Sequence, residues 1–182
     1  SRGDWSSDVC SSDLKDLDAL LRPIPDWPKP GVTFRDIGPL LDDPEALMAA
    51  VAAMVEPWRG TSIDVVAGAE SRGFIFGTAI ALALGVGFAP LRKPGKLPPP
   101  VSRVSYTLEY GEDQLEAAAD AFNQRNVLLV DDVLATGGTL RAAAALVEQQ
   151  RGVVVGASIL LEIPVLEGRK LLSPMRIESV LS

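Results

Sequence analysis

The stretch from Asn126 to Ala145, NVLLVDDVLATGGTLRAAAA, decides the fold. It begins with a short apolar run, 127–130, which two adjacent carboxylates, Asp131 and Asp132, follow. A turn of small residues leads from these acids into an alanine-rich segment with a helical pattern. The apolar run is too short for a helix and contains β-branched residues, so we predict a buried parallel strand. The stretch therefore predicts a strand, an acid pair, a glycine turn and a helix.

The turn in this stretch is suited to a phosphate group. Its glycines let backbone N–H groups point inward, and the following helix adds free amides and the positive end of its dipole. The turn consists of Ala135, Thr136, Gly137, Gly138 and Thr139. The sequence has neither a Walker-type lysine at this turn nor a G-x-G-x-x-G motif, which makes P-loop and dinucleotide interpretations weak.

The acid pair beside the turn requires a different ligand group. Carboxylates repel a phosphate, so we expect Asp131 and Asp132 to face hydroxyl groups or a hydrated divalent cation. A ligand with a phosphate next to a ribose satisfies both the turn and the acids. The alternative is an ordinary strand–helix turn with solvated acids. Because Gly-Gly and Asp-Asp coincide at one turn, we favour the ligand site.

The composition limits the classes of protein to consider. With 182 residues, 47% of them hydrophobic and 23% charged, the chain matches an ordinary globular domain with a sizeable core. The net charge of −7 argues against broad nucleic-acid binding, and no apolar segment reaches membrane-spanning length. The single cysteine, Cys10, suits a reducing cytoplasm and allows neither an internal disulfide nor a cysteine-based zinc site. With no histidine present, a general acid or base must be Glu, Asp, Tyr or Lys.

The first residues need separate treatment. The segment 4–14, DWSSDVCSSDL, resembles one reading frame of a common sequencing-library adapter. We therefore expect residues 1–14 to be a non-native, disordered segment and residues 15–182 to form a single domain. The alternative is a genuine disordered tail rich in serine and aspartate.

Two further stretches repeat the order of strand and polar turn. A β-branched run over 63–69 precedes Glu70, Ser71 and Arg72, and an apolar helix is predicted over 74–84. A third strand over 87–92 ends in a cationic cluster of Arg92, Lys93 and Lys96. Taken alone, that cluster could equally be a solvated loop. Since Arg72 ends a neighbouring strand, we favour a site for a polyphosphate.

The remaining segments complete an alternating pattern. We predict helices over 44–58 and 164–172, a strand over 153–161, an edge strand over 177–180, and a turn after the segment 33–37. Prolines, glycine and aromatic residues between 96 and 110 indicate a mobile loop with a short hairpin, a candidate lid, while 115–122 could be strand or helix. The alternation predicts a doubly wound parallel sheet with binding groups at the carboxyl ends of its strands.

The acid pair followed by A-T-G-G-T resembles the phosphoribosyl-diphosphate signature of the type I phosphoribosyltransferases. Four further motifs are similar to the adenine-using branch of that family: PKPGVTFRDI at 28–37, ESRGF at 70–74, RKPGKLP at 92–98 and LEYG at 108–111. The resemblance implies an α/β fold, a doubly wound, mostly parallel sheet flanked by helices, with a small N-terminal hood and a flexible lid loop. It also implies a cytoplasmic homodimer that converts adenine and phosphoribosyl diphosphate into AMP and pyrophosphate with Mg²⁺, the metal being held by substrate and water.

The resemblance further implies a role for each motif on the donor side. The turn 135–139 binds the 5′-phosphate, and Asp131 and Asp132 bind the ribose hydroxyls. The pyrophosphate loop contains Glu70, Ser71 and Arg72, with a cis peptide between Glu70 and Ser71. The diphosphate is held by Arg92, Lys93 and Lys96, one of them across a dimer interface.

On the adenine side, the resemblance implies a slot with an aromatic and an aliphatic wall. The residues assigned to it are Thr33 through its backbone, Phe34, Arg35 and Ile163, with core packing as the alternative for Phe34 and Ile163. Glu109 and Tyr110 close over the site. Because there is no histidine, Glu109 is our candidate acid or base for the N9 proton, and Tyr110 and Arg72 join it as catalytic residues. Tyr106 receives no role.

Two alternatives to adenine transfer remain open. The nearer is a phosphoribosyltransferase for a 6-oxopurine or a pyrimidine. The other is a non-catalytic regulator that senses phosphoribosyl diphosphate, which would need an added nucleic-acid-binding element; the sequence contains no basic helix of that kind.

Overall fold

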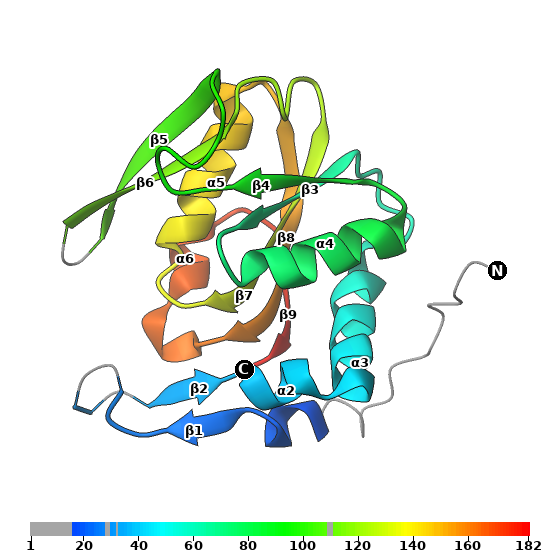
Figure 1. Cartoon of the computed structure of the whole chain (residues 1–182), viewed down its shortest axis with the longest axis vertical. Coiled ribbons are helices and arrows are strands. Elements are labelled where there is room, and N and C mark those ends of the chain that lie inside the picture. Colours follow the sequence, from blue (N-terminus) through cyan, green and yellow to red (C-terminus); the bar gives the residue numbers. More distant parts are fainter. Residues whose placement is uncertain (1–15, 28–29, 32, 109–110) are drawn as a thin grey trace.

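The computed structural model describes residues 16–27, 30–31, 33–108 and 111–182 (Figure 1). Its centre is a five-stranded sheet in the order β4-β3-β7-β8-β9. The strands are β3 (Val65–Ala69), β4 (Gly87–Leu91), β7 (Asn126–Leu134), β8 (Val153–Glu162) and β9 (Ile177–Leu181). Every neighbouring pair is parallel, which confirms the predicted doubly wound sheet, with β9 at one edge.

Helices cover both faces of this sheet, and β7 shows why. Val127 and Leu129 are buried in the core on the side of α5 (Gly138–Gln149), while Leu128 and Val130 are buried in the core on the side of α3 (Pro44–Val55) and α4 (Gly73–Leu84). Successive side chains of a strand point to opposite faces, so a continuous apolar run suits a strand covered on both sides.

The predicted boundaries of β7 need one correction. The sequence placed Asp131 and Asp132 after the strand, but β7 continues through them to Leu134. The neighbouring strand is the reason, because β8 pairs with β7 as far as Leu134 and Glu162. The acid pair is therefore held rigidly inside the sheet near its carboxyl edge.

The segment before the sheet forms the small hood. Residues 16–19 are helical, and β1 (Arg22–Ile24) pairs antiparallel with β2 (Phe34–Asp36). The predicted turn after this segment is wrong, because a short helix with proline near its start, α2 (Gly38–Asp42), lies there. The helix α3 follows, capped by the Asp43 carboxylate, and ends as the 3₁₀ turn η1 (Glu56–Trp58), where Pro57 cannot continue an α-helix.

The hairpin of β5 (Val101–Leu108) and β6 (Gly111–Ala118) is longer than the predicted short hairpin. Its register pairs Val104 with Leu115, so the helical alternative for 115–122 is wrong: 115–118 belong to β6 and 119–122 form a turn. The reason is burial, since Leu115 and Ala117 pack into the core beside α5. The predicted helix 164–172 is divided into η2 (Pro164–Leu166) and α6 (Gly168–Leu172) by Glu167, whose φ is +54°. Within the described ranges, no helix is long and apolar enough to cross a membrane.

Candidate active site

The phosphate turn, residues 135–139, joins the carboxyl end of β7 to the start of α5. Gly137 has a φ of +87°, a left-handed conformation that favours glycine. The turn lines a pocket of about 70 Å³ together with Asp131 and Leu140. Free amides at the start of α5 and the helix dipole favour an anion in this position. The predicted order of strand, turn and helix is confirmed.

The acid pair beside the turn is unusual in its burial. Asp132 is 4% exposed, and Asp131 is partly buried with its Oδ1 accepting the backbone N–H of Asp132 at 2.9 Å. Burial and the neighbouring charge of Asp132 raise the pKa of Asp131 well above its ordinary value. Burial also raises the pKa of Asp132, although Arg72 opposes this. A ligand hydroxyl or a cation beside the pair would therefore stabilise its charged form.

Arg72 connects three of the predicted motifs. Its Nε lies 2.8 Å from Asp132 Oδ2, although the N–H is not aligned as a hydrogen bond. Its guanidinium carbon lies 5.7 Å from the centroid of the Phe34 ring, in the range of cation–π contacts. Phe34 also meets Trp27 edge to face, with ring centroids 4.6 Å apart. The hood, the turn after β3 and the acids of β7 thus converge on one arginine.

The Glu70 carboxylate pairs with two of the three cationic side chains that follow β4. Its Oε2 accepts a hydrogen bond from Arg92 Nε at 2.9 Å, and its Oε1 accepts one from Lys96 Nζ at 2.6 Å. Burial alone raises the pKa of Glu70, but these hydrogen bonds outweigh it and lower the pKa below its ordinary value. The peptide between Glu70 and Ser71 is cis, as the resemblance implied. The turns after β3 and β4 therefore form one charged cluster.

Lys93 lies apart from that cluster. It donates to Asp113 and, at 3.3 Å, to the hydroxyl of Tyr106, both of which belong to the hairpin. Tyr106 in turn donates to Asp113 Oδ2 at 3.0 Å. Burial alone lowers the pKa of Lys93, but its contacts with Asp113 and Tyr106 raise it. The structure thus brings Arg92 and Lys96 together and places Lys93 against the hairpin.

The residues expected at the adenine slot are only partly assembled. Thr33 is exposed, and Arg35 forms an ion pair with Asp18. Ile163 is partly buried, and its N–H donates to Leu134 O at 2.9 Å, which holds it beside the end of β7. Glu109 and Tyr110 lie outside the described residues.

Sequence reasoning missed one buried acid next to this site. Glu116 on β6 is 1% exposed; its Oε1 accepts a hydrogen bond from Arg103 Nε at 2.8 Å, and its Oε2 accepts the backbone N–H of Gly95 at 3.0 Å. It therefore fixes the turn between Arg92 and Lys96. Glu116 lies between two apolar residues, Leu115 and Ala117, and this pattern could have revealed it. A charged residue in a buried apolar segment requires a partner.

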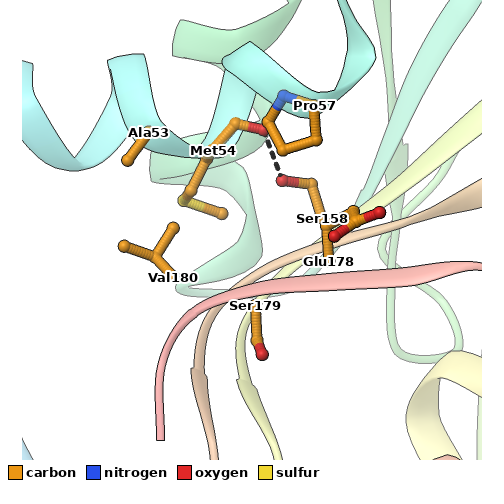
Figure 2. A pocket seen from close by; sticks show the side chains of 7 residues that line it. All are labelled: Ala53, Met54, Pro57, Ser158, Glu178, Ser179 and Val180. Carbon is orange, nitrogen blue, oxygen red and sulfur yellow. Dashed lines mark hydrogen bonds between the residues drawn. The ribbon is translucent and has the colours of Figure 1, made fainter. Parts of the chain in front are cut away.

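A separate cavity of about 150 Å³ lies between α3 and the strands β8 and β9 (Figure 2). The Ser158 hydroxyl in its wall donates to Met54 O at 2.8 Å, and Glu178 pairs with Arg176. These polar groups are satisfied within the protein. The side chains that the sequence predicted to bind a ligand lie instead at the carboxyl ends of β3, β4 and β7.

Comparison with known proteins identifies the family of the chain. The family model described as "Phosphoribosyl transferase domain" matches residues 39–179, so the fold and the site define a phosphoribosyltransferase domain. The chain is 52% identical to the adenine phosphoribosyltransferase of Methylococcus capsulatus, over 91% of this chain and 97% of that protein. It is 51% identical to the one from Thermobifida fusca, over 93% and 98%. The chain belongs to the adenine phosphoribosyltransferase family.

A solved structure supports the same conclusion. The adenine phosphoribosyltransferase of Saccharomyces cerevisiae, complexed with adenine and an imino-altritol bisphosphate, superposes with a TM-score of 0.89. It is 37% identical to this chain, and the match covers 94% of this chain and 100% of that one.

Proposed function

We propose that the chain transfers the 5-phosphoribosyl group of phosphoribosyl diphosphate to adenine, which yields AMP and pyrophosphate in purine salvage. Membership of the adenine phosphoribosyltransferase family and the yeast relative's complex with adenine support this proposal. One structural observation carries it: Arg72 contacts both Asp132 and Phe34. A single site thus contains an acid pair for a sugar, a cation for a diphosphate and an aromatic wall for a base.

The donor fits the described groups in order. The 5′-phosphate occupies the turn 135–139, and the ribose hydroxyls face Asp131 and Asp132. The diphosphate lies against Arg72 and the cluster of Glu70, Arg92 and Lys96, next to Ser71. Lys93 contributes through the long-range field of its charge while it remains bound to Asp113.

The charges of the site suit the reaction. Displacement of pyrophosphate from the anomeric carbon builds positive charge on the ribose ring and negative charge on the leaving group. Carboxylates near the sugar and cations near the diphosphate stabilise both changes. Because these groups are fixed in a rigid sheet and its adjoining turns, they need little reorganisation as the charges develop.

We propose Mg²⁺ as the cofactor. Within the ranges that the structure describes, no three His, Cys, Asp or Glu side chains gather as a metal site. In this proposal substrate oxygens and water hold the ion, and the partly buried Asp131 and the buried Asp132 fit hydrogen bonding to its water shell. When bound, the ion neutralises charge on the diphosphate.

The adenine slot is built from the hood and the end of β8. Phe34 and Ile163 sandwich the ring, the Thr33 backbone reads one edge, and Arg35 reads the same edge after it leaves Asp18. Glu109 exchanges the N9 proton, with Tyr110 beside it. We also propose a cytoplasmic homodimer.

A panel of bases tests this function. Adenine, hypoxanthine, xanthine and orotate are each supplied with phosphoribosyl diphosphate and Mg²⁺, and turnover is followed by absorbance. We expect turnover with adenine alone. Preference for a 6-oxo base would contradict the adenine slot, and binding of the donor without turnover of any base would indicate a sensor.

A further inference from the structure

The phosphate turn is supported from behind by α6, an element with no assigned role. Gly168, the first residue of α6, is buried. A Cβ atom added to it would lie 2.3 Å from Ala135 O, 2.8 Å from Leu134 Cδ1 and 3.2 Å from the Gly137 amide nitrogen. Backbone therefore meets backbone here, and only a residue without a side chain fits.

The contact is reciprocal. A Cβ atom added to Gly137 would lie 2.9 Å from Gly168 O and 3.3 Å from Leu172 Cγ. The start of α5 and the whole of α6 lie side by side (Figure 1). The two glycines thus set the distance between the turn and α6.

Arg169 holds α6 against the sheet, so that α6 cannot move away from the phosphate turn. Its Nε donates to both carboxylate oxygens of Glu162 at 2.8 Å, its Nη1 donates to Ile177 O at 2.8 Å, and its Nη2 donates to Ser179 Oγ at 3.1 Å. These partners lie on β8 and β9. Since α6 is fixed to two strands of the sheet, a side chain at position 168 would displace the turn and not the helix.

We propose that Gly168 and Arg169 are positioning residues for the phosphate turn, which set the affinity of the site for the 5′-phosphate of the donor and of AMP. The proposal rests on the function proposed above, in which this turn holds that phosphate. Neither residue touches the ligand; both act through the backbone of residues 135–137.

The first test compares Gly168→Ala with Gly87→Ala. A Cβ atom at position 87, at the start of β4, meets nothing within 4 Å, so this variant is a control for the replacement of glycine by alanine. Calorimetry measures the Kd of AMP and of adenine, and kinetics measure the KM of each substrate. For Gly168→Ala we expect the Kd of AMP and the KM of phosphoribosyl diphosphate to rise about tenfold. The Kd of adenine, which carries no phosphate, should stay within about twofold of the parent, as should every constant of Gly87→Ala.

The second test uses Arg169→Gln, which loosens α6 without filling the contact. The single variant should weaken AMP binding about threefold and leave adenine binding unchanged. In the double variant, α6 can yield to the added methyl group, so the loss from Gly168→Ala should become smaller. If Gly168→Ala does not fold, Arg169→Gln alone decides between the outcomes.

Equal weakening of AMP and adenine, or unchanged AMP binding, would overturn the positioning role. A parent protein that binds no AMP would instead contradict the proposed function, and the two failures are therefore distinguishable.

Discussion

At Asp131, the proposed function and the stability of the fold make opposite demands. The carboxylate is partly buried next to a second acid, an arrangement that no core requires and that a bound ribose can use. An asparagine of the same shape keeps the volume but loses the charge. Its consequences for catalysis and for folding should therefore have opposite signs.

Asp131→Asn should lower kcat/KM for phosphoribosyl diphosphate by about 10- to 100-fold, because a hydrogen bond to a charged group contributes about 1.5–3 kcal/mol. The Kd of adenine should change little. Steady-state kinetics and calorimetry measure both constants. Unchanged kcat/KM would remove Asp131 from the sugar site.

The same variant should be more stable than the parent at neutral pH. Burial raises the pKa of Asp131 in the folded state above the ordinary value of 3.8, so its favourable contribution is complete below that pH and is lost as the pH rises through the folded-state pKa. Asparagine does not titrate. The Tm of Asp131→Asn minus that of the parent should therefore grow with pH across this window, as calorimetric scans at several pH values would show. A constant difference would contradict the raised pKa.

Glu109→Ala should lower kcat for adenine about 100-fold, since general acid–base groups typically contribute 10²–10⁴. Glu112→Ala, which removes a glutamate three residues further along the chain, is the control and should retain the parent rate. Fixed-time assays of both variants measure kcat for adenine. If Glu109→Ala kept its rate within a fewfold of the parent, another group would have to exchange the N9 proton.

At the scale of the element, close approach of β3 and α4 depends on a glycine. A Cβ atom on Gly68 would lie 2.6 Å from Gly73 O, and neither backbone can move without disturbing the sheet. Gly68→Ala should therefore reduce the free energy of unfolding by about 1–3 kcal/mol, as overpacking does. Urea denaturation measures the loss, and Gly87→Ala, which has open space, should show less than about 0.5 kcal/mol.

The elements differ in how well the sequence predicted them. The strands β3, β7 and β8 were predictable because buried parallel strands are continuous apolar runs bounded by turns. The full length of the hairpin was not, because β6 contains the buried Glu116, whose partners Arg103 and Gly95 lie far away in the sequence. The same limit applies to the site. Motifs predicted Arg72 near Asp132, but no local pattern reveals that Lys93 pairs with Asp113 or that Gly168 meets Ala135.

At the scale of the whole molecule, α4 has an apolar surface that the described residues leave uncovered. Leu82 is 72% exposed, and Ile75, seven residues earlier on the same side, is 42% exposed. A helix that is apolar on all sides is usually buried, which fits the proposed homodimer.

Leu82→Glu should therefore weaken self-association at least about tenfold, since it places a charge in a buried contact. Val165→Glu, at a position on η2 that is also highly exposed, should leave the association unchanged. Sedimentation velocity across a concentration series measures both. A dimer that persists unaltered in Leu82→Glu would place the interface elsewhere.

The pairing of Glu70 with Arg92 and Lys96 has a consequence for turnover. Both cations already hold an anion before any ligand arrives. In the proposed site, a diphosphate that binds Arg92 and Lys96 would replace the Glu70 carboxylate as their counterion. Its net attraction is the difference between two sets of ion pairs and not the full strength of one. The Glu70 carboxylate would then compete with pyrophosphate for Arg92 and Lys96 after the reaction. The same ion pairs that weaken binding of the donor would therefore speed release of pyrophosphate.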